Sequence, residues 1–120
     1  MLLNTSEYKH LLAGLMVDAA QDALAFGKIV DIGKNEFNLK DLDLEDFVKS
    51  IVGELLEQDM QIVKAAPTNS ELLWLRHPDY ILPKKEAIVK LINLWKTADD
   101  YDFLVWFIPP QNLKDKPNNR

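Results

Sequence analysis

The chain has 120 residues, of which 48% are hydrophobic, and this apolar content excludes a disordered chain and suffices for one buried core. It contains no cysteine, which excludes a disulfide framework and a thiolate metal site and fits a reducing compartment. Acidic side chains outnumber basic ones by 19 to 14, for a net charge of −5, and this disfavours nucleic acid as a partner because phosphate binding depends on lysine and arginine.

The negative charge is concentrated in the first half of the chain. Residues 1–60 carry twelve acidic and five basic side chains, whereas residues 61–120 carry seven and nine. An acidic half is compatible with a basic protein partner, and it is also typical of a surface that only keeps a protein soluble. Composition alone leaves both explanations open.

The first predicted element is a long helix. Thr5 or Ser6 can cap it, and Gly27 lies just past its expected end. Asp18 and Asp22 lie one turn apart, away from the middle of its apolar stripe, and no cation three or four residues away can pair with them. The apolar stripe itself consists of Tyr8, Leu11, Leu12, Leu15, Met16, Ala19, Ala23 and Phe26.

This helix is expected to belong to the mature protein. Its apolar stretch, residues 11–17, lacks the positively charged segment that opens a signal peptide and is cut off by Asp18. The longest apolar run of the chain, residues 103–108, is far too short to cross a bilayer. We therefore expect a cytoplasmic protein without a membrane partner.

Residues 27–42 are predicted to connect two helices. Their sequence is GKIVDIGKNEFNLKDL, in which Gly33 and Asn35 are typical turn residues. The KIVDI portion is also compatible with a short edge strand.

The second predicted helix follows this connector. Asp43 is its expected N-cap, Glu45 and Asp46 lie in its first turn, and it is expected to end near Gln58. Its predicted buried face consists of Phe47, Val48, Ile51, Val52, Leu55 and Leu56.

The middle of the chain predicts a strand and a third helix. MQIVKAA alternates in polarity and predicts a short strand, and ELLWLR predicts either a second strand paired with it or a short helix. RHPDY could hold an Arg–His–Asp set, although a proline between His77 and Asp79 is more typical of a turn. Pro83 suits the first position of a helix that continues over residues 84–98.

The last predicted element is a strand. Residues 101–108, YDFLVWFI, are aromatic, β-branched and nearly all apolar, so both faces of the strand are expected to be covered, and Pro109 and Pro110 end it. The elements together predict an α+β fold, with three main helices packed on a small, mainly antiparallel sheet. Residues 1–110 are expected to form a single globular domain, followed by a polar tail over residues 111–120.

Few side chains have the spacing of a catalytic or metal site. Asp99, Asp100 and Asp102 are candidates for binding a divalent cation or for acid–base work, but they lack the glycine and the closing glutamate of a calcium loop and suit a turn. His10 and His77 lie far apart and without metal-binding spacing, and no serine elbow or phosphate-binding glycine loop is present. We therefore expect no enzymatic activity, no metal and no cofactor.

The candidate binding surface is the acidic side of the first two helices. Lys49 is the only basic residue of the second helix, so most of the carboxylates have no cation nearby in the sequence. Such like charges repel, which a protein tolerates for solubility or because a cationic partner binds. The residues predicted to bind a partner are Asp18, Asp22, Asp43, Glu45, Asp46, Glu54 and Glu57.

Three stretches of the sequence resemble a known family. They read EYKHLLAGLMVDAAQDAL, DLEDFVKSIVGELLEQDMQIVKA and EAIVKLINLWKTADDYDFLVWFIPP. Together they resemble small bacterial immunity proteins encoded beside polymorphic toxins, such as those of contact-dependent growth inhibition. The chain departs from that family in the turn EQDM, which lacks a glycine, and in a longer link, LLWLRHPDYILP.

The resemblance implies stoichiometric inhibition of a cognate toxin domain that acts in the cytoplasm, often a nuclease. An acidic helical face would imitate phosphate and accelerate the encounter with a basic cleft. The alternative function is a small acidic adaptor or regulatory subunit that binds another basic protein. A homodimer formed through an exposed strand such as YDFLVWFI is compatible with either function.

Overall fold

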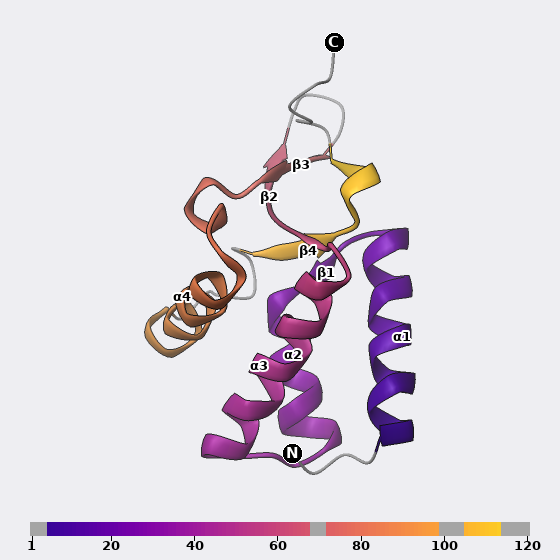
Figure 1. The fold of residues 1–120 in the computed structure, drawn as a ribbon, viewed down its shortest axis with the longest axis vertical. Coiled ribbons are helices and arrows are strands. Elements are labelled where there is room, and N and C mark those ends of the chain that lie inside the picture. The colour runs from indigo at the N-terminus through magenta and orange to yellow at the C-terminus, as the bar shows by residue number, and fades with distance from the viewer. Residues whose placement is uncertain (1–4, 68–71, 99–104, 114–120) are drawn as a thin grey trace.

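The protein is an α+β fold, described here from a computed structural model that defines residues 5–67, 72–98 and 105–113. Figure 1 shows three long helices packed on one side of a small sheet, as the sequence predicts. The helices are α1 (Thr5–Gln21), α3 (Asp41–Glu57) and α4 (Lys84–Thr97), and the strands are β1 (Leu24–Ala25), β2 (Gln61–Pro67), β3 (Leu72–Arg76) and β4 (Trp106–Ile108).

The segment between α1 and α3 differs from the prediction. α1 ends at Gln21, and the residues expected to form a connector or an edge strand are helical: α2 (Phe26–Asp31) continues into a π-helical turn (Ile32–Glu36). The prediction was wrong because Gly27 and Gly33, which suggest turns in a sequence, are buried within these helical turns.

Gly33 lets the π-helical turn lie directly on α3. A Cβ atom at this position would be 2.6 Å from Cδ1 of Leu44 and 2.8 Å from Cδ2 of Phe47, which is closer than real contacts allow. The ring of Phe37 extends the same contact, with its centroid 5.9 Å from that of Phe47. Glycine is required at position 33 because Leu44 and Phe47 leave no room for a side chain.

α3 is the central helix of the fold. It begins at Asp41, after Lys40, so Asp43 lies in its first turn and is not the N-cap that the sequence suggests. In Figure 1, α1 and α4 lie on either side of it. The hydroxyl of Tyr8 in α1 donates a hydrogen bond to the backbone oxygen of Ser50 at 3.0 Å. The buried face of α3 contains all six predicted residues and one more: Leu44, Phe47, Val48, Ile51, Val52, Leu55 and Leu56.

The last strand lies in the middle of the sheet. The strand order is β1-β4-β2-β3, and all neighbours are antiparallel. Phe107 pairs with Leu24 of β1 on one side and with Ile62 of β2 on the other. The hairpin of β2 and β3 is the paired-strand alternative of the sequence prediction, which is thereby confirmed.

Both faces of β4 are covered, as its apolar sequence predicts. Phe107 belongs to the main core beneath the helices, and Ile108 belongs to a second cluster on the opposite face. That cluster also contains buried Leu113, which follows the 3₁₀ turn Pro110–Asn112, and it is flanked by the partly buried rings of Trp74 and Trp106.

The pairing of β4 bears on the expected homodimer. Trp106 and Phe107 are paired on both sides, so they offer no free edge to a second copy, and Ile108 is paired with Gln61 of β2. The preceding part of the predicted strand, residues 101–104, lies outside the described residues.

Replacing Gly33 by alanine is expected to lower the free energy of unfolding by about 1–3 kcal/mol, because the added methyl group must displace Leu44 and Phe47 within a packed core. Gly14→Ala is the matched control. Gly14 lies within α1 with no atom near its Cβ position, so alanine is expected to stabilise the protein by about 0.5–1 kcal/mol. Urea denaturation measures both variants, and equal effects would contradict the close contact at Gly33.

Candidate protein-binding surface

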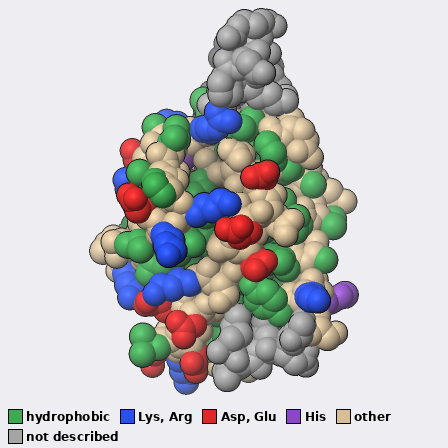
Figure 2. All heavy atoms as spheres, viewed as in Figure 1, with side chains coloured by type: hydrophobic (Ala, Val, Ile, Leu, Met, Phe, Trp, Pro, Cys, Tyr) green, Lys and Arg blue, Asp and Glu red, His purple; other side chains and the backbone are tan. Residues whose placement is uncertain are grey.

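One side of α3 carries four carboxylates at helical spacing, three of them exposed and that of Glu54 half-buried. Asp43, Asp46, Glu54 and Glu57 are separated by three, eight and three residues, which places them on one side of the helix over about 21 Å. We call these four residues the acidic stripe. Figure 2 views the molecule from the side of Figure 1 and shows acidic side chains interspersed with lysine and arginine. The pairing of each carboxylate therefore decides where negative charge remains.

Glu45, which the sequence also assigns to the binding surface, lies off the acidic stripe and joins α3 to α4. The Nζ atom of Lys49 is 3.0 Å from its carboxylate, and Lys96 of α4 binds the other carboxylate oxygen. Only 15% of the Glu45 side chain is exposed. Hydrogen bonds from Lys96 and then from Lys49 lower the pKa of Glu45 below its ordinary value of 4.5.

Lysines from other elements pair with two more of the predicted residues. Asp18 lies 3.0 Å from the Nζ atom of Lys28 in α2, and Glu57 lies 3.5 Å from that of Lys84 at the start of α4. All four side chains are at least 45% exposed, so each pair contributes only about 0–1 kcal/mol. Asp18 faces α2, which places it apart from the acidic stripe.

The remaining four predicted residues, Asp22, Asp43, Asp46 and Glu54, form no ion pair within the described part of the chain. Asp22 lies just beyond the end of α1, and the other three belong to the acidic stripe. The pKa of Tyr8 is raised by burial and further by the negative charge of Glu54. Within the described residues, the unpaired carboxylates of α3 are therefore those of Asp43, Asp46 and Glu54 in the acidic stripe and that of Asp41 at the start of the helix.

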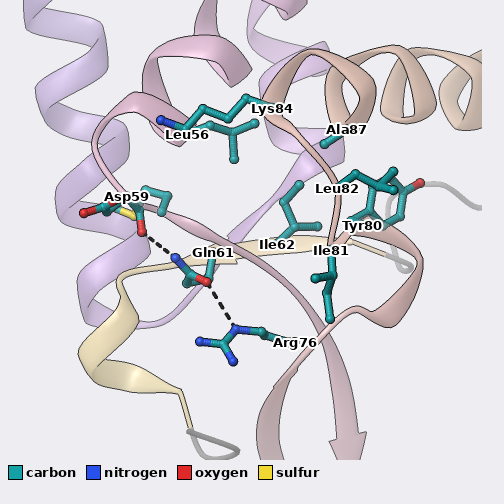
Figure 3. A pocket seen from close by; sticks show the side chains of 11 residues that line it. Leu56, Asp59, Gln61, Ile62, Arg76, Tyr80, Ile81, Leu82, Lys84 and Ala87 are labelled. Carbon is teal, nitrogen blue, oxygen red and sulfur yellow. Dashed lines mark hydrogen bonds between the residues drawn. The ribbon is translucent and has the colours of Figure 1, made fainter. Parts of the chain in front are cut away.

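A cleft of about 230 Å³ lies where the acidic stripe ends, and Figure 3 shows it from close by. Its walls come from the end of α3, the starts of β2 and α4, and the segment from Arg76 to Leu82. The side chain of Gln61 donates to the backbone oxygen of Asp59 at 2.9 Å and accepts from Nε of Arg76 at 3.4 Å. The apolar lining consists of Leu56, Met60, Ile62, Tyr80, Ile81, Leu82 and Ala87.

The turn from α3 into β2 shapes one rim of this cleft. The N–H of Asp59 donates to the backbone oxygen of Leu56, and the N–H of Met60 donates to that of Leu55, both at 3.0 Å. These are the paired bonds of a Schellman motif, which usually places glycine in the left-handed position. Asp59 occupies that position with φ at 67° and is therefore strained.

His77 fixes the opposite wall, and RHPDY forms a turn, which the proline in it suggests. The Nδ1 atom of His77 accepts a hydrogen bond from the N–H of Asp79 at 3.4 Å. The His77 ring packs edge-on against the ring of Tyr80, with the two ring centroids 4.9 Å apart. Burial lowers the pKa of His77; the charge of Asp79 opposes this effect, whereas Lys64 and Lys90 add to it. Because Nδ1 accepts this hydrogen bond, the bond requires the neutral form of the His77 imidazole.

The sequence candidates for metal chemistry lie in separate places. His10 is exposed on α1, His77 lies beside the cleft, and Asp99, Asp100 and Asp102 lie outside the described residues. Among residues 5–67, 72–98 and 105–113, no group of three or more histidine, aspartate and glutamate side chains is arranged to hold a metal ion. Over the same ranges, no helix combines the length and apolar character needed to cross a bilayer.

The sequence does not predict the cleft. Its polar side chains, Gln61, Arg76 and Lys84, belong to three different elements and share no motif. The only sequence signal was the RHPDY segment, which contributes Arg76 and Tyr80 to the lining.

Glu45→Gln is expected to lower the melting temperature at pH 7, because it removes the charge that holds Lys49 and Lys96. The lowered pKa means that this stabilisation is complete above the ordinary value of 4.5 and is lost as the pH falls through the pKa of the folded state. Melting curves of wild type and variant from pH 7 downwards should therefore converge in acid. Asp46→Asn, which breaks no ion pair among the residues that the structure describes, is the control, and an equal loss there would contradict a structural role for Glu45.

His77→Asn is expected to reduce the dependence of stability on pH. Because the fold lowers the pKa of His77, its contribution is complete above the ordinary value of 6.5 and is lost as the pH falls through the folded-state pKa. Asparagine still caps the turn but does not titrate. Melting temperatures between pH 7.5 and 5.5 should fall more for wild type than for His77→Asn. His10→Asn, at an exposed position of α1, should keep the wild-type slope, and an unchanged slope in His77→Asn would refute the assignment.

Comparison with known proteins leaves the family open. No protein-family model, no curated protein and no solved structure matches this chain.

Proposed function

We propose that this protein is an immunity protein that binds and neutralises a cognate bacterial toxin domain acting in the cytoplasm, with a nuclease as the expected target. The observation that carries the proposal is the acidic stripe of α3. Three of its four carboxylates, Asp43, Asp46 and Glu54, have no ion pair within the described residues. The sequence resemblance to immunity proteins supports the same function.

The geometry of the acidic stripe suits a basic cleft. The carboxylates recur along a rigid helix, so they can enter a groove together without losing the conformational entropy of a loop. Lysine and arginine side chains that hold the phosphates of a nucleic acid would find carboxylates there instead. A toxin that depends on such a groove would lose access to its substrate.

The lysines of the described residues leave most of the acidic stripe unpaired. Lys49, the only cation of α3, is held by Glu45 off the acidic stripe. The Nζ atom of Lys84 lies 3.5 Å from the carboxylate of Glu57, and both side chains are exposed. A lysine or arginine of a partner can replace this contact with little loss of stability. A basic partner can therefore contact three carboxylates of the acidic stripe without displacing an ion pair of the described residues.

The first test is protection from killing. The C-terminal domain encoded by the open reading frame immediately upstream is expressed in a bacterial host with and without this protein, and growth is followed. Killing that this protein prevents is the expected outcome. A domain that is harmless, or killing that persists although this protein is soluble, would contradict the proposal and favour the acidic adaptor.

The second test concerns the acidic stripe. The triple variant Asp43→Asn, Asp46→Asn, Glu54→Gln should associate with the toxin domain about tenfold or more slowly at low salt, because it removes the charges that steer the encounter. Increasing salt should narrow the difference from wild type. Stopped-flow fluorescence measures both rates.

A control triple variant loses the same charge elsewhere. Asp31→Asn, Glu36→Gln and Glu86→Gln change exposed carboxylates of α2, the π-helical turn and α4. It should associate at nearly the wild-type rate. Equal slowing in both triple variants would mean that net charge, and not the acidic stripe, controls association.

A further inference from the structure

The cleft beside the acidic stripe has the size of a single side chain. Its volume of about 230 Å³ lies below the roughly 300–1,000 Å³ of pockets that hold small-molecule ligands and cofactors. A large apolar side chain fills a space of this order. The volume therefore favours a protein partner over a small molecule.

The lining of the cleft is apolar inside and polar at the rim. Figure 3 shows Ile62, Ile81 and Leu82 on one side, with Gln61 bridging Asp59 and Arg76 on the other. Ile81 and Leu82 are 66% and 40% exposed, so apolar surface faces solvent here. An apolar pocket surrounded by polar groups is the usual form of an interface hot spot.

One ion pair connects the cleft with the acidic stripe. Lys84 lines the cleft and reaches across it toward Leu56, while its Nζ atom contacts Glu57. The pair is long and exposed, so a lysine or arginine of a partner can take over Glu57 and let Lys84 move off the cleft. Binding of charge to the acidic stripe and opening of the cleft would then occur together.

Asp59 places a further carboxylate at this rim of the cleft. Its backbone is left-handed, a conformation that aspartate tolerates better than most residues and that Asn38 and Asp41 adopt as well. The carboxylate continues the acidic stripe to the cleft, whose lining also contains the cations of Arg76 and Lys84.

We infer that the cleft is a socket for one large apolar side chain of a basic protein partner, and that lysine or arginine residues flanking this side chain contact Glu54, Glu57 and Asp59. The inference deepens the proposed function and rests on it for the identity of the partner. Its chemistry is independent of that identity. The occupant is a short segment in which a leucine or phenylalanine stands between cationic residues.

Three short peptides test the socket without the toxin. Each is acetylated and amidated and has two lysines on either side of a central leucine, phenylalanine or serine. NMR titration of the 15N-labelled protein should show the leucine or phenylalanine peptide shifting the amides of Gln61, Ile62, Tyr80 and Ala87. Its Kd should be about tenfold or more below that of the serine peptide, because a buried apolar side chain contributes that much. The serine peptide should shift mainly residues of the acidic stripe.

A pair of variants assigns the effect to the cleft. Leu82→Ser should weaken binding of the apolar peptides to the level of the serine peptide. Val89→Ser is the matched control, because Val89 is an exposed apolar residue of α4 that does not line the cleft. It should bind all three peptides as wild type does.

The outcomes separate this inference from the proposed function. If all three peptides bind alike and shift only α3, the socket is refuted, and protection from toxin killing still decides the proposed function. If none of the peptides binds, the inference of a socket is also refuted, and the proposed function again depends on the protection experiment. If the apolar peptides bind in the cleft but no toxin is neutralised, the socket stands and the partner is another basic protein.

Discussion

The whole candidate surface depends on the burial of one face of α3. Phe47, Ile51 and Leu55 are fully buried, and each such side chain contributes about 1.5–3 kcal/mol. Repulsion between carboxylates one turn apart costs only about 0.2–0.5 kcal/mol a pair. The stabilisation from these buried side chains is therefore several times larger than the electrostatic repulsion within the acidic stripe. Because the buried face is secure, the charges on the opposite side are free to serve binding.

The three-dimensional fold rearranges the charge that the sequence displays. The acidic first half of the chain receives cations from the basic second half, since Lys84 and Lys96 of α4 both reach carboxylates of α3. Glu45 becomes a link between helices and Glu57 is paired with Lys84, while the other three carboxylates of the acidic stripe have no ion pair within the described residues. What remains is a narrower and better defined acidic surface than composition indicates. It lies beside a cleft, which joins electrostatic and apolar recognition in one place.

The sequence predicts the long elements well because their signals are local. The three long helices follow from apolar periodicity, and the β2–β3 hairpin is one of the two alternatives that the sequence left open for residues 71–76. The helical turns around Gly33 could not be predicted, because glycine is needed there to make room for Leu44, a residue of a different helix. The two residues of β1 are too few for any pattern. The ion pairs of Glu45 with Lys96 and of Glu57 with Lys84 depend on tertiary packing, so the separation of paired from unpaired carboxylates required the structure.

The central place of β4 has a consequence for biosynthesis. β1 and β2 emerge from the ribosome before β4 and do not pair with each other; β1 pairs with Trp106 and Phe107, and β2 pairs with residues 106–108. The N–H of Phe26, at the start of α2, also donates to the backbone oxygen of Val105 at 3.0 Å. Such long-range closure is slow to form and comes last during translation. A nascent chain without residues 105–108 can pair β2 with β3, but it lacks the central strand that joins β1 to this hairpin, so the sheet on which the helices pack is incomplete.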